Sequence, residues 1–217
     1  MTTTVVVWVA VAVLAALLLL TFGWRWASRV WSLPCPTLLA WSLETRLSDR
    51  VAGTEVTLDR IGVRPGQRVL EIGPGPGRLL IPAARRVLPG GEVVGVDIQA
   101  GMLERLRRRT QRAGVTNLTA LQGDATRLTV PEASFDIVYL AAVLGEIPDR
   151  AVALAQCYRA LKPGGVLSIT EIRSDPHYQT RATVKRMAEG AGFRFQSIQG
   201  GWWLFTANFV KPGDTQA

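Results

Sequence analysis

A glycine-rich turn in the first half of the chain has residue types and spacing that suit ligand binding. Residues 69–72 form an apolar run that predicts a short buried strand, residues 73–77 read Gly-Pro-Gly-Pro-Gly, and a helical pattern follows over 79–88. A strand, a glycine turn and a helix together bring backbone N–H groups and a helix N-terminus close to a ligand. Glycine is needed there because a Cβ would block close approach or forbid a positive φ. Alone, the same residues are equally typical of a tight turn.

The spacing within this turn separates two kinds of nucleotide-type site. The dinucleotide fingerprint G-x-G-x-x-G fails, because Arg78 stands where its third glycine belongs. The pattern present is acidic-x-Gly-x-Gly-x-Gly, formed by Glu71, Gly73, Gly75 and Gly77. The sequence therefore disfavours an NAD-dependent oxidoreductase.

A carboxylate at the end of the next predicted strand could bind a ribose. Asp97 ends the strand predicted over 92–97, about twenty residues beyond the glycine turn, where a carboxylate can accept both ribose hydroxyls. The alternative role is the N-cap of the helix that follows, over 99–106. If Asp97 binds the ribose, the neighbouring Ile98 would cover one face of an adenine.

A second carboxylate follows the third predicted strand. Gly123-Asp124-Ala125 ends the strand predicted over 118–122. Asp124 could accept a hydrogen bond from the exocyclic amine of an adenine, and the backbone N–H of Ala125 could reach a ring nitrogen. A plain turn residue is the alternative for Asp124.

The elements that must position these residues alternate between strand and helix. Repeated strand–helix units imply a mostly parallel sheet that is covered by helices on both faces. A Gly200-Gly201 turn between two apolar segments predicts a closing antiparallel hairpin. The further predicted segments are strands over 135–140 and 166–172, helices over 102–113, 152–161 and 183–191, a turn over 162–165, and hairpin strands over 193–199 and 202–210.

Taken together, these motifs resemble the class I S-adenosylmethionine (SAM)-dependent methyltransferases, of the methyltransferase type 11 or UbiE-like kind, over roughly residues 64–211. The resemblance implies a doubly wound α/β fold with a seven-stranded, mostly parallel sheet, and SAM as cofactor. It implies that Glu71 holds the methionine end, through its amino group or through the glycine loop. The matching segments are the glycine motif at 71–77, Asp97, Asp124, the fourth-strand motif at 135–138 and the turn at 161–165.

The methyl acceptor is expected beyond the carboxyl ends of the fourth and fifth strands in this fold. Segments 141–146 and 171–178 follow those strands. An acceptor amine or hydroxyl must lose a proton, which calls for a general base. The candidates are His177, Glu146 and Tyr178, and the only histidine of the chain is the best suited to titrate near neutral pH. A surface histidine without a role is the alternative.

The N-terminal region reads as a membrane anchor. Residues 5–22 are uncharged and apolar, and Trp24-Arg25-Trp26 follows in place of a signal-peptide cleavage site. Arg25 and Arg29 then put the rest of the chain in the cytoplasm. The sequence thus predicts a single-pass membrane protein with three parts: an anchor at 1–24, a juxtamembrane amphipathic segment at 25–60 and a methyltransferase domain at 61–217.

Charge and cysteine usage limit the partners. Lys+Arg 25 against Asp+Glu 17 gives a formal charge of +8, and five arginines gather between Arg105 and Arg112. That cluster is a solvated helix face or a contact with anionic lipid, and the absence of interleaved aromatic residues disfavours nucleic acid. Cys35 and Cys157 are expected as free thiols, with no metal site.

The function predicted from the sequence is methyl transfer from SAM to a lipophilic or membrane-resident acceptor. A phospholipid amine, a quinone-like hydroxyl and a lipophilic thiol are all compatible with an anchored enzyme. Methylation of a protein lysine and a non-catalytic SAM-binding membrane scaffold stay open as alternatives. The oligomeric state is left open.

Overall fold

The computed structural model describes residues 7–8, 11 and 53–213. Most of the predicted anchor and of the juxtamembrane segment lie outside the described residues. Within the described part, no helix is both long enough and apolar enough to span a membrane. The elements run in the order α4 (Thr54–Ile61), β1 (Arg68–Ile72), α5 (Leu80–Arg86), β2 (Glu92–Asp97), α6 (Ala100–Arg112), β3 (Leu118–Gln122), η2 (Ala125–Arg127), β4 (Phe135–Ala141), η3 (Leu144–Glu146), α7 (Arg150–Ala160), β5 (Leu161–Ile172), α8 (Arg181–Gly190), β6 (Arg194–Gly200) and β7 (Leu204–Val210).

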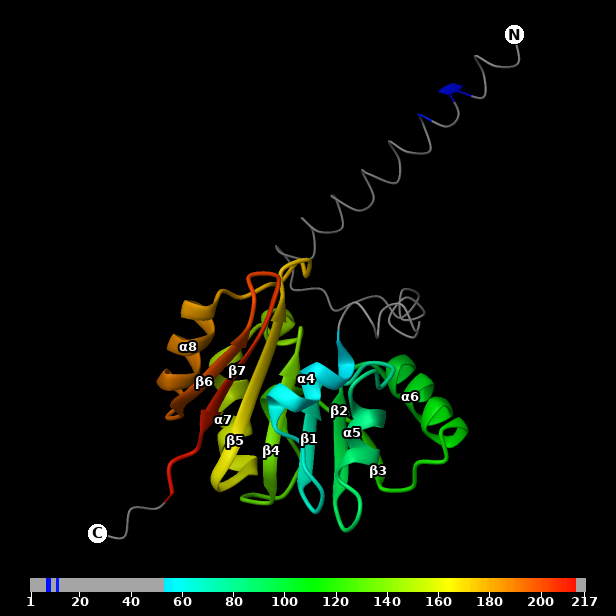
Figure 1. Ribbon diagram of the computed structural model, residues 1–217, viewed down its shortest axis with the longest axis horizontal. Coiled ribbons are helices and arrows are strands. Elements are labelled where there is room, and N and C mark those ends of the chain that lie inside the picture. Colours follow the sequence, from blue (N-terminus) through cyan, green and yellow to red (C-terminus); the bar gives the residue numbers. More distant parts are fainter. Residues whose placement is uncertain (1–6, 9–10, 12–52, 214–217) are drawn as a thin grey trace.

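One seven-stranded sheet organises the domain (Figure 1). Its strand order is β3-β2-β1-β4-β5-β7-β6, and β7 pairs antiparallel with both β5 and β6, whereas the other pairs are parallel. The predicted mixed sheet with a closing antiparallel hairpin is therefore confirmed. The chain order reverses between β1 and β4, and ligands of open α/β sheets bind at such a point, beyond the carboxyl ends of the strands.

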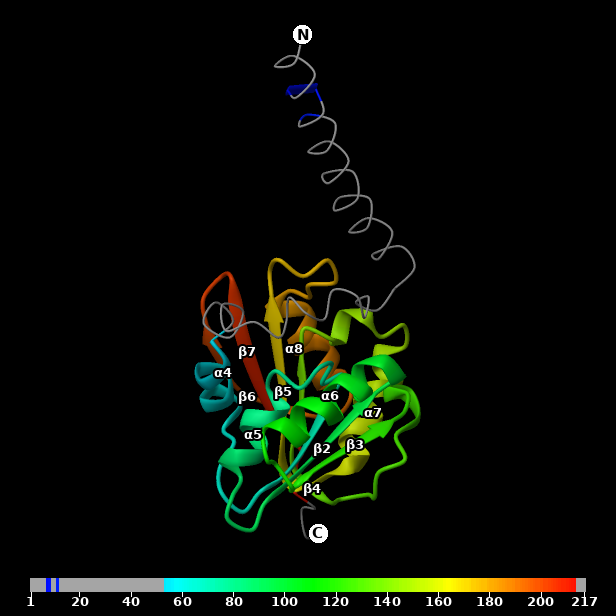
Figure 2. The same ribbon diagram turned by 90° about the vertical axis from the view of Figure 1, so that its right-hand side faces the viewer.

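Helices cover both faces of the sheet, as the apolar strands require. Figure 2 looks onto the β3 edge, with α4 and α5 on one side of the sheet and α7 on the other. One core lies under α4, α5 and α6 and includes Val69 and Ile137, and the other lies under α7 and α8 and includes Leu70 and Val138. Alternate residues of one strand thus face different cores, which explains the nearly continuous apolar runs of β1 and β4.

Two boundaries differ from the sequence prediction. Leu58 and Ile61 of α4 are buried against the sheet, so the packed domain begins by Thr54 and not at residue 61. The predicted turn at 162–165 is part of β5: the N–H of Gly164 donates to the carbonyl of Lys211, and the N–H of Lys211 donates back to Gly165, at 2.9 Å each. Residues 162–165 alone favour a turn, but Lys211, which follows β7, supplies backbone partners that extend β5 through them.

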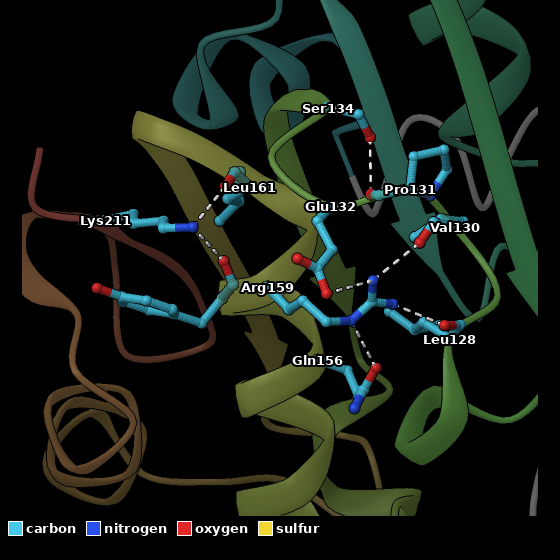
Figure 3. Close-up of polar contacts among 10 residues, drawn as sticks. Leu128, Val130, Pro131, Glu132, Ser134, Gln156, Arg159, Leu161 and Lys211 are labelled. Atoms are coloured by element: carbon cyan, nitrogen blue, oxygen red, sulfur yellow. Dashed lines mark hydrogen bonds and ion pairs between the residues drawn. The ribbon is translucent and has the colours of Figure 1, made fainter. Parts of the chain in front are cut away.

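A polar network holds the amino ends of β4 and β5 (Figure 3). The guanidinium of Arg159, in the last turn of α7, donates to the carbonyls of Leu128 at 2.7 Å and Val130 at 3.1 Å. Lys211 Nζ donates to the carbonyls of Tyr158 and Leu161 at 2.8 Å each. These contacts satisfy backbone carbonyls of a loop and of the α7 C-terminus. They lie at the amino ends of the parallel strands, opposite the carboxyl ends.

Candidate active site

The three glycines of the loop after β1 serve different purposes. All have positive φ, of 67° at Gly73, 52° at Gly75 and 83° at Gly77. A Cβ built on Gly73 would lie 2.7 Å from Val143 Cγ2, and one on Gly77 would lie 2.4 Å from Leu106 Cδ1, whereas one on Gly75 meets nothing within 4 Å. Gly73 and Gly77 therefore allow close packing, and Gly75 faces open space where a ligand can approach the backbone.

Asp97 ties this loop to the end of β2. Its buried carboxylate accepts the N–H of Gly75 on Oδ2 at 3.0 Å and the N–H of Gln99 on Oδ1 at 2.9 Å. Burial raises the pKa of Asp97, and the two N–H bonds act against that rise. Each oxygen keeps a lone pair for a ribose hydroxyl. The N-cap of α6 is Gln99, so the alternative role of Asp97 as that N-cap is wrong.

Glu71 is a buried carboxyl group on β1, behind the glycine loop. Its Oε2 accepts a hydrogen bond from Tyr139 Oη at 2.7 Å, across the β1–β4 pair. Burial raises the pKa of Glu71 to about 8, the Tyr139 bond and the Arg78 charge lower it, and the Asp97 charge raises it. A cationic amino group at this position would favour the ionised carboxylate. Tyr139 was missed by sequence reasoning, because only the strand pairing places it opposite Glu71.

The expected adenine-side residues lie at the ends of β2 and β3. Ile98 is 59% exposed, and Gln122 Nε2 donates to its carbonyl at 3.3 Å. Asp124 is exposed and is the N-cap of η2, where its Oδ1 accepts the N–H and the hydroxyl of Thr126 at 2.8 Å each. These bonds lower the pKa of Asp124 and keep it charged. Ala125 is the first residue of η2. The 3-10 helix therefore fixes the positions of both predicted adenine contacts, Asp124 and Ala125.

Four features of these strand ends together suit SAM. They are the open space in front of Gly75, the lone pairs of Asp97, the exposed side chain of Ile98 and the charged carboxylate of Asp124. The glycine loop offers backbone groups that a ligand can approach. The end of β2 offers a carboxylate that can accept two ribose hydroxyls, next to an apolar side chain, and η2 offers a carboxylate that can accept a hydrogen bond from an amine. These groups come from three adjacent strand ends, which the sheet order β3-β2-β1 brings together.

A pocket of about 390 Å³ lies beyond the carboxyl ends of β4 and β5. Gly145 of η3 packs so closely on the backbone of the next loop that a Cβ would lie 1.9 Å from the carbonyl oxygen of His177. The neighbouring Val143 is the residue that Gly73 touches, so η3 joins the pocket to the glycine loop. The pocket is lined by Gly145, Arg150, Arg173, Pro176, His177, Tyr178 and Gln179.

Two of the three predicted acid–base candidates line this pocket, and Glu146 does not. Tyr178 packs edge-to-face on Phe205, with ring centroids 6.2 Å apart. His177 is only 9% exposed, so the alternative of a surface histidine is wrong. Its Nε2 is buried and has no hydrogen-bond partner among the residues that the structure describes. The loop backbone is held in a turn, in which the His177 N–H donates to Asp175 Oδ1 at 2.6 Å and the Tyr178 N–H donates to the Asp175 carbonyl at 3.3 Å.

Glu171, at the end of β5, lies behind the pocket wall and was not singled out from the sequence. It is 1% exposed, and its Oε2 accepts the N–H of the pocket residue Gln179 at 3.0 Å. Its Oε1 has no partner within the described part of the chain. Burial raises the pKa of Glu171 to about 8; the Gln179 bond and the Arg150 charge lower it, and the Asp175 charge raises it. A glutamate inside an apolar strand pattern is the signal that could have found it.

Comparisons with known proteins agree with this geometry. Residues 69–165 match the family model described as a methyltransferase domain. The chain is 37% identical over 129 residues to the ubiquinone/menaquinone biosynthesis C-methyltransferase UbiE of Pectobacterium carotovorum subsp. carotovorum, covering 59% of this chain and 51% of that protein. It is 40% identical over 119 residues to an uncharacterized 37.1 kDa protein in transposon TN4556 of Streptomyces fradiae, covering 54% of this chain and 33% of that protein.

A solved structure extends the similarity in fold. A SAM-dependent methyltransferase from Aquifex aeolicus superposes with a TM-score of 0.77 at 20% identity, over 82% of this chain and all of that one. The chain spans a third to about half the length of the two curated relatives. The glycine loop, Asp97 and Asp124 thus lie within the segment that matches a methyltransferase domain, and the chain shares the fold of a solved SAM-dependent methyltransferase.

Proposed function

We propose that this protein methylates a lipophilic, membrane-resident acceptor, and that the acceptor is a quinone-like ring methylated at carbon. The names of the UbiE relatives support the ring and the atom. They move the expected methylation site from the hydroxyl considered in the sequence analysis to a ring carbon. A phospholipid amine and a thiol are the lipophilic acceptors that this proposal leaves aside.

The contacts described above support the proposed cofactor half of the site. When bound, SAM supplies a methyl group on a sulfonium, which an acceptor nucleophile displaces. Asp97 would hold the ribose, Glu71 the cationic amino group, and Asp124 with Ala125 the adenine. Because Asp97 also binds the N–H of Gly75, it positions the loop and the ribose with one carboxylate.

The acceptor half contains two groups that suit a phenolic ring, His177 and Glu171. This proposal depends chiefly on one observation, that His177 Nε2 and Glu171 Oε1 are buried without a hydrogen-bond partner within the described part of the chain. At neutral pH a carboxyl with a pKa of about 8 is mostly protonated, so Glu171 places no negative charge behind the wall of a pocket that would hold an apolar ring. His177 Nε2 can accept the proton that the ring hydroxyl must lose before its carbon becomes nucleophilic.

Membrane residence is proposed from the sequence of the N-terminal region. The apolar run at 5–22 would anchor the protein by one span, with the domain in the cytoplasm. The predicted arginine cluster is partly engaged with protein: Arg109 donates to the Pro76 carbonyl at 2.9 Å, Arg107 to the Ala120 carbonyl at 3.2 Å, and Arg108 pairs with Glu104. Lipid contact through this cluster is therefore a smaller part of the proposal.

The test is incubation of the full-length protein with methyl-labelled SAM and a total membrane extract. We expect label in the prenylquinone fraction, and much less label with the Asp97→Ala variant. Label in protein would favour the lysine alternative, and label in phospholipid would reassign the acceptor. SAM binding without transfer to any fraction would favour a scaffold.

A further inference from the structure

The turn between β6 and β7 presents two exposed tryptophans. Trp202 is 71% exposed, more than any other large apolar side chain within residues 53–213, and Trp203 is 43% exposed. Their rings meet edge-to-face, with centroids 5.6 Å apart. Exposed apolar groups that gather in one place mark interaction sites. Residues 200–203 are called the tryptophan turn below.

Three arginines, from α4, the loop after β5 and α8, surround the tryptophan turn. The Arg173 guanidinium carbon lies 5.7 Å from the centroid of the Trp202 ring. Arg181 donates to the carbonyls of Gly200 at 3.1 Å and Gly201 at 2.6 Å. Arg60 Nη1 lies 2.9 Å from the place where a Cβ on Gly200 would stand. Among residues 53–213 none of the three forms an ion pair, so the turn is a positively charged surface with an apolar tip.

The tryptophan turn lies at the rim of the acceptor pocket. Arg173 follows β5 and lines the pocket, and its backbone N–H donates to the Trp203 carbonyl at 2.8 Å. Figure 1 shows the β6–β7 turn beside the end of β5. A binding partner that contacts the two tryptophans would therefore also contact the opening of the pocket.

We propose that the tryptophan turn docks on an anionic phospholipid bilayer and that the acceptor enters the pocket from that bilayer. This rests on the proposed function, whose acceptor is membrane-resident. Indole rings favour the headgroup region of a bilayer, where the ring meets apolar chains and its N–H meets water. Guanidinium groups beside them attract anionic headgroups.

The ring geometry favours a bilayer over single-stranded nucleic acid. Nucleic-acid surfaces stack successive bases on aromatic faces. The planes of Trp202 and Trp203 stand 76° apart, and Arg173 lies over the Trp202 ring. The pair thus offers edges at a projecting turn and no run of parallel faces.

The test places a fluorescent label on the turn of the full-length protein. In a Cys35→Ala background, Gly201→Cys is labelled; a Cβ on Gly201 meets nothing within 4 Å, and the native Cys157 is buried. Gly190→Cys is the matched control, because a Cβ there is equally free and residue 190 ends α8 at the opposite end from Arg181. Both proteins are reconstituted in vesicles of equal parts phosphatidylcholine and phosphatidylglycerol that contain brominated lipid.

We expect severalfold stronger quenching at residue 201 than at residue 190, and loss of most of that difference in Trp202→Ala/Trp203→Ala. Equal quenching at both positions would overturn the proposal. An oligonucleotide that binds the labelled protein and abolishes the quenching would reassign the turn to nucleic acid. Methyl label in membrane lipid without quenching at 201 would overturn only the docking proposal. Quenching at 201 with label only in soluble acceptors would support docking and overturn the proposed function.

Discussion

Replacing Glu71 by glutamine should stabilise the protein at alkaline pH while weakening SAM binding. In the folded protein the buried carboxyl group has a pKa of about 8, against an ordinary value of 4.5. Between these values the folded protein holds a proton that the unfolded chain has released. The free energy of unfolding therefore falls as pH rises from 4.5 to 8, because the unfolded state binds fewer protons.

The size of this effect follows from the same interval. Each pH unit contributes about 1.4 kcal/mol, so keeping Glu71 buried costs about 4 kcal/mol at pH 8 and less than about 1 kcal/mol at pH 5. Glutamine has nearly the same shape, and its carbonyl oxygen can still accept the Tyr139 hydroxyl. Any cost of burying its NH₂ group is independent of pH.

The assay is chemical denaturation of the wild type and Glu71→Gln at pH 5 and pH 8. We expect the stability of the variant relative to the wild type to increase by about 3–4 kcal/mol between the two conditions. Glu132→Gln, at a side chain that is 74% exposed, is the matched control and should show no such increase. A pH-independent difference for Glu71→Gln would refute the reasoning. The same variant should bind SAM more weakly, since an amide cannot pair with a cationic amino group.

Four further variants test other parts of the structure. Gly77→Ala should destabilise the fold by about 2 kcal/mol or more, because its Cβ would meet Leu106. Gly75→Ala should cost only about 1 kcal/mol of stability, for its positive φ, but should block SAM binding. Chemical denaturation measures the two stabilities, and calorimetry measures SAM binding. Glu171→Gln should keep the group behind the pocket wall neutral at every pH and so remove the loss of methyl transfer that ionisation of Glu171 causes above about pH 8, as a pH–rate profile would show. Arg159→Met should lower stability by about 1–3 kcal/mol, by leaving loop carbonyls unpaired, with SAM affinity unchanged.

Local pattern was sufficient for most of the sheet. The strands at 92–97 and 118–122 were predicted to the residue, because each is a short run of strand-forming residues between turn residues. The turn predicted at 162–165 was wrong, since the distant Lys211 supplies the backbone partners that make it strand. Tertiary pairing of this kind is not visible in local spacing.

The candidate site likewise has features that local spacing predicts and features that depend on tertiary packing. The glycine turn and Asp97 could be found from sequence because their spacing is local, but the bond from the Gly75 N–H to Asp97 required the fold. The burial of His177 could not be predicted, because Gly145, which is distant in the sequence, packs on its backbone. Local pattern thus singled out candidates on both sides of the site, and the packed fold was needed to show which of them are buried and which line the pocket.

The central claim is tested most directly by asking where a labelled methyl group ends up on a defined acceptor. The full-length protein in vesicles would be given SAM with a deuterated methyl group and a prenylated quinol that has one unsubstituted ring carbon. Mass spectrometry after acid hydrolysis should find the intact deuterated methyl group on that ring carbon, and Asp97→Ala should abolish most of it. Label on an oxygen, on phospholipid or on protein, with the quinol unchanged, would contradict the account.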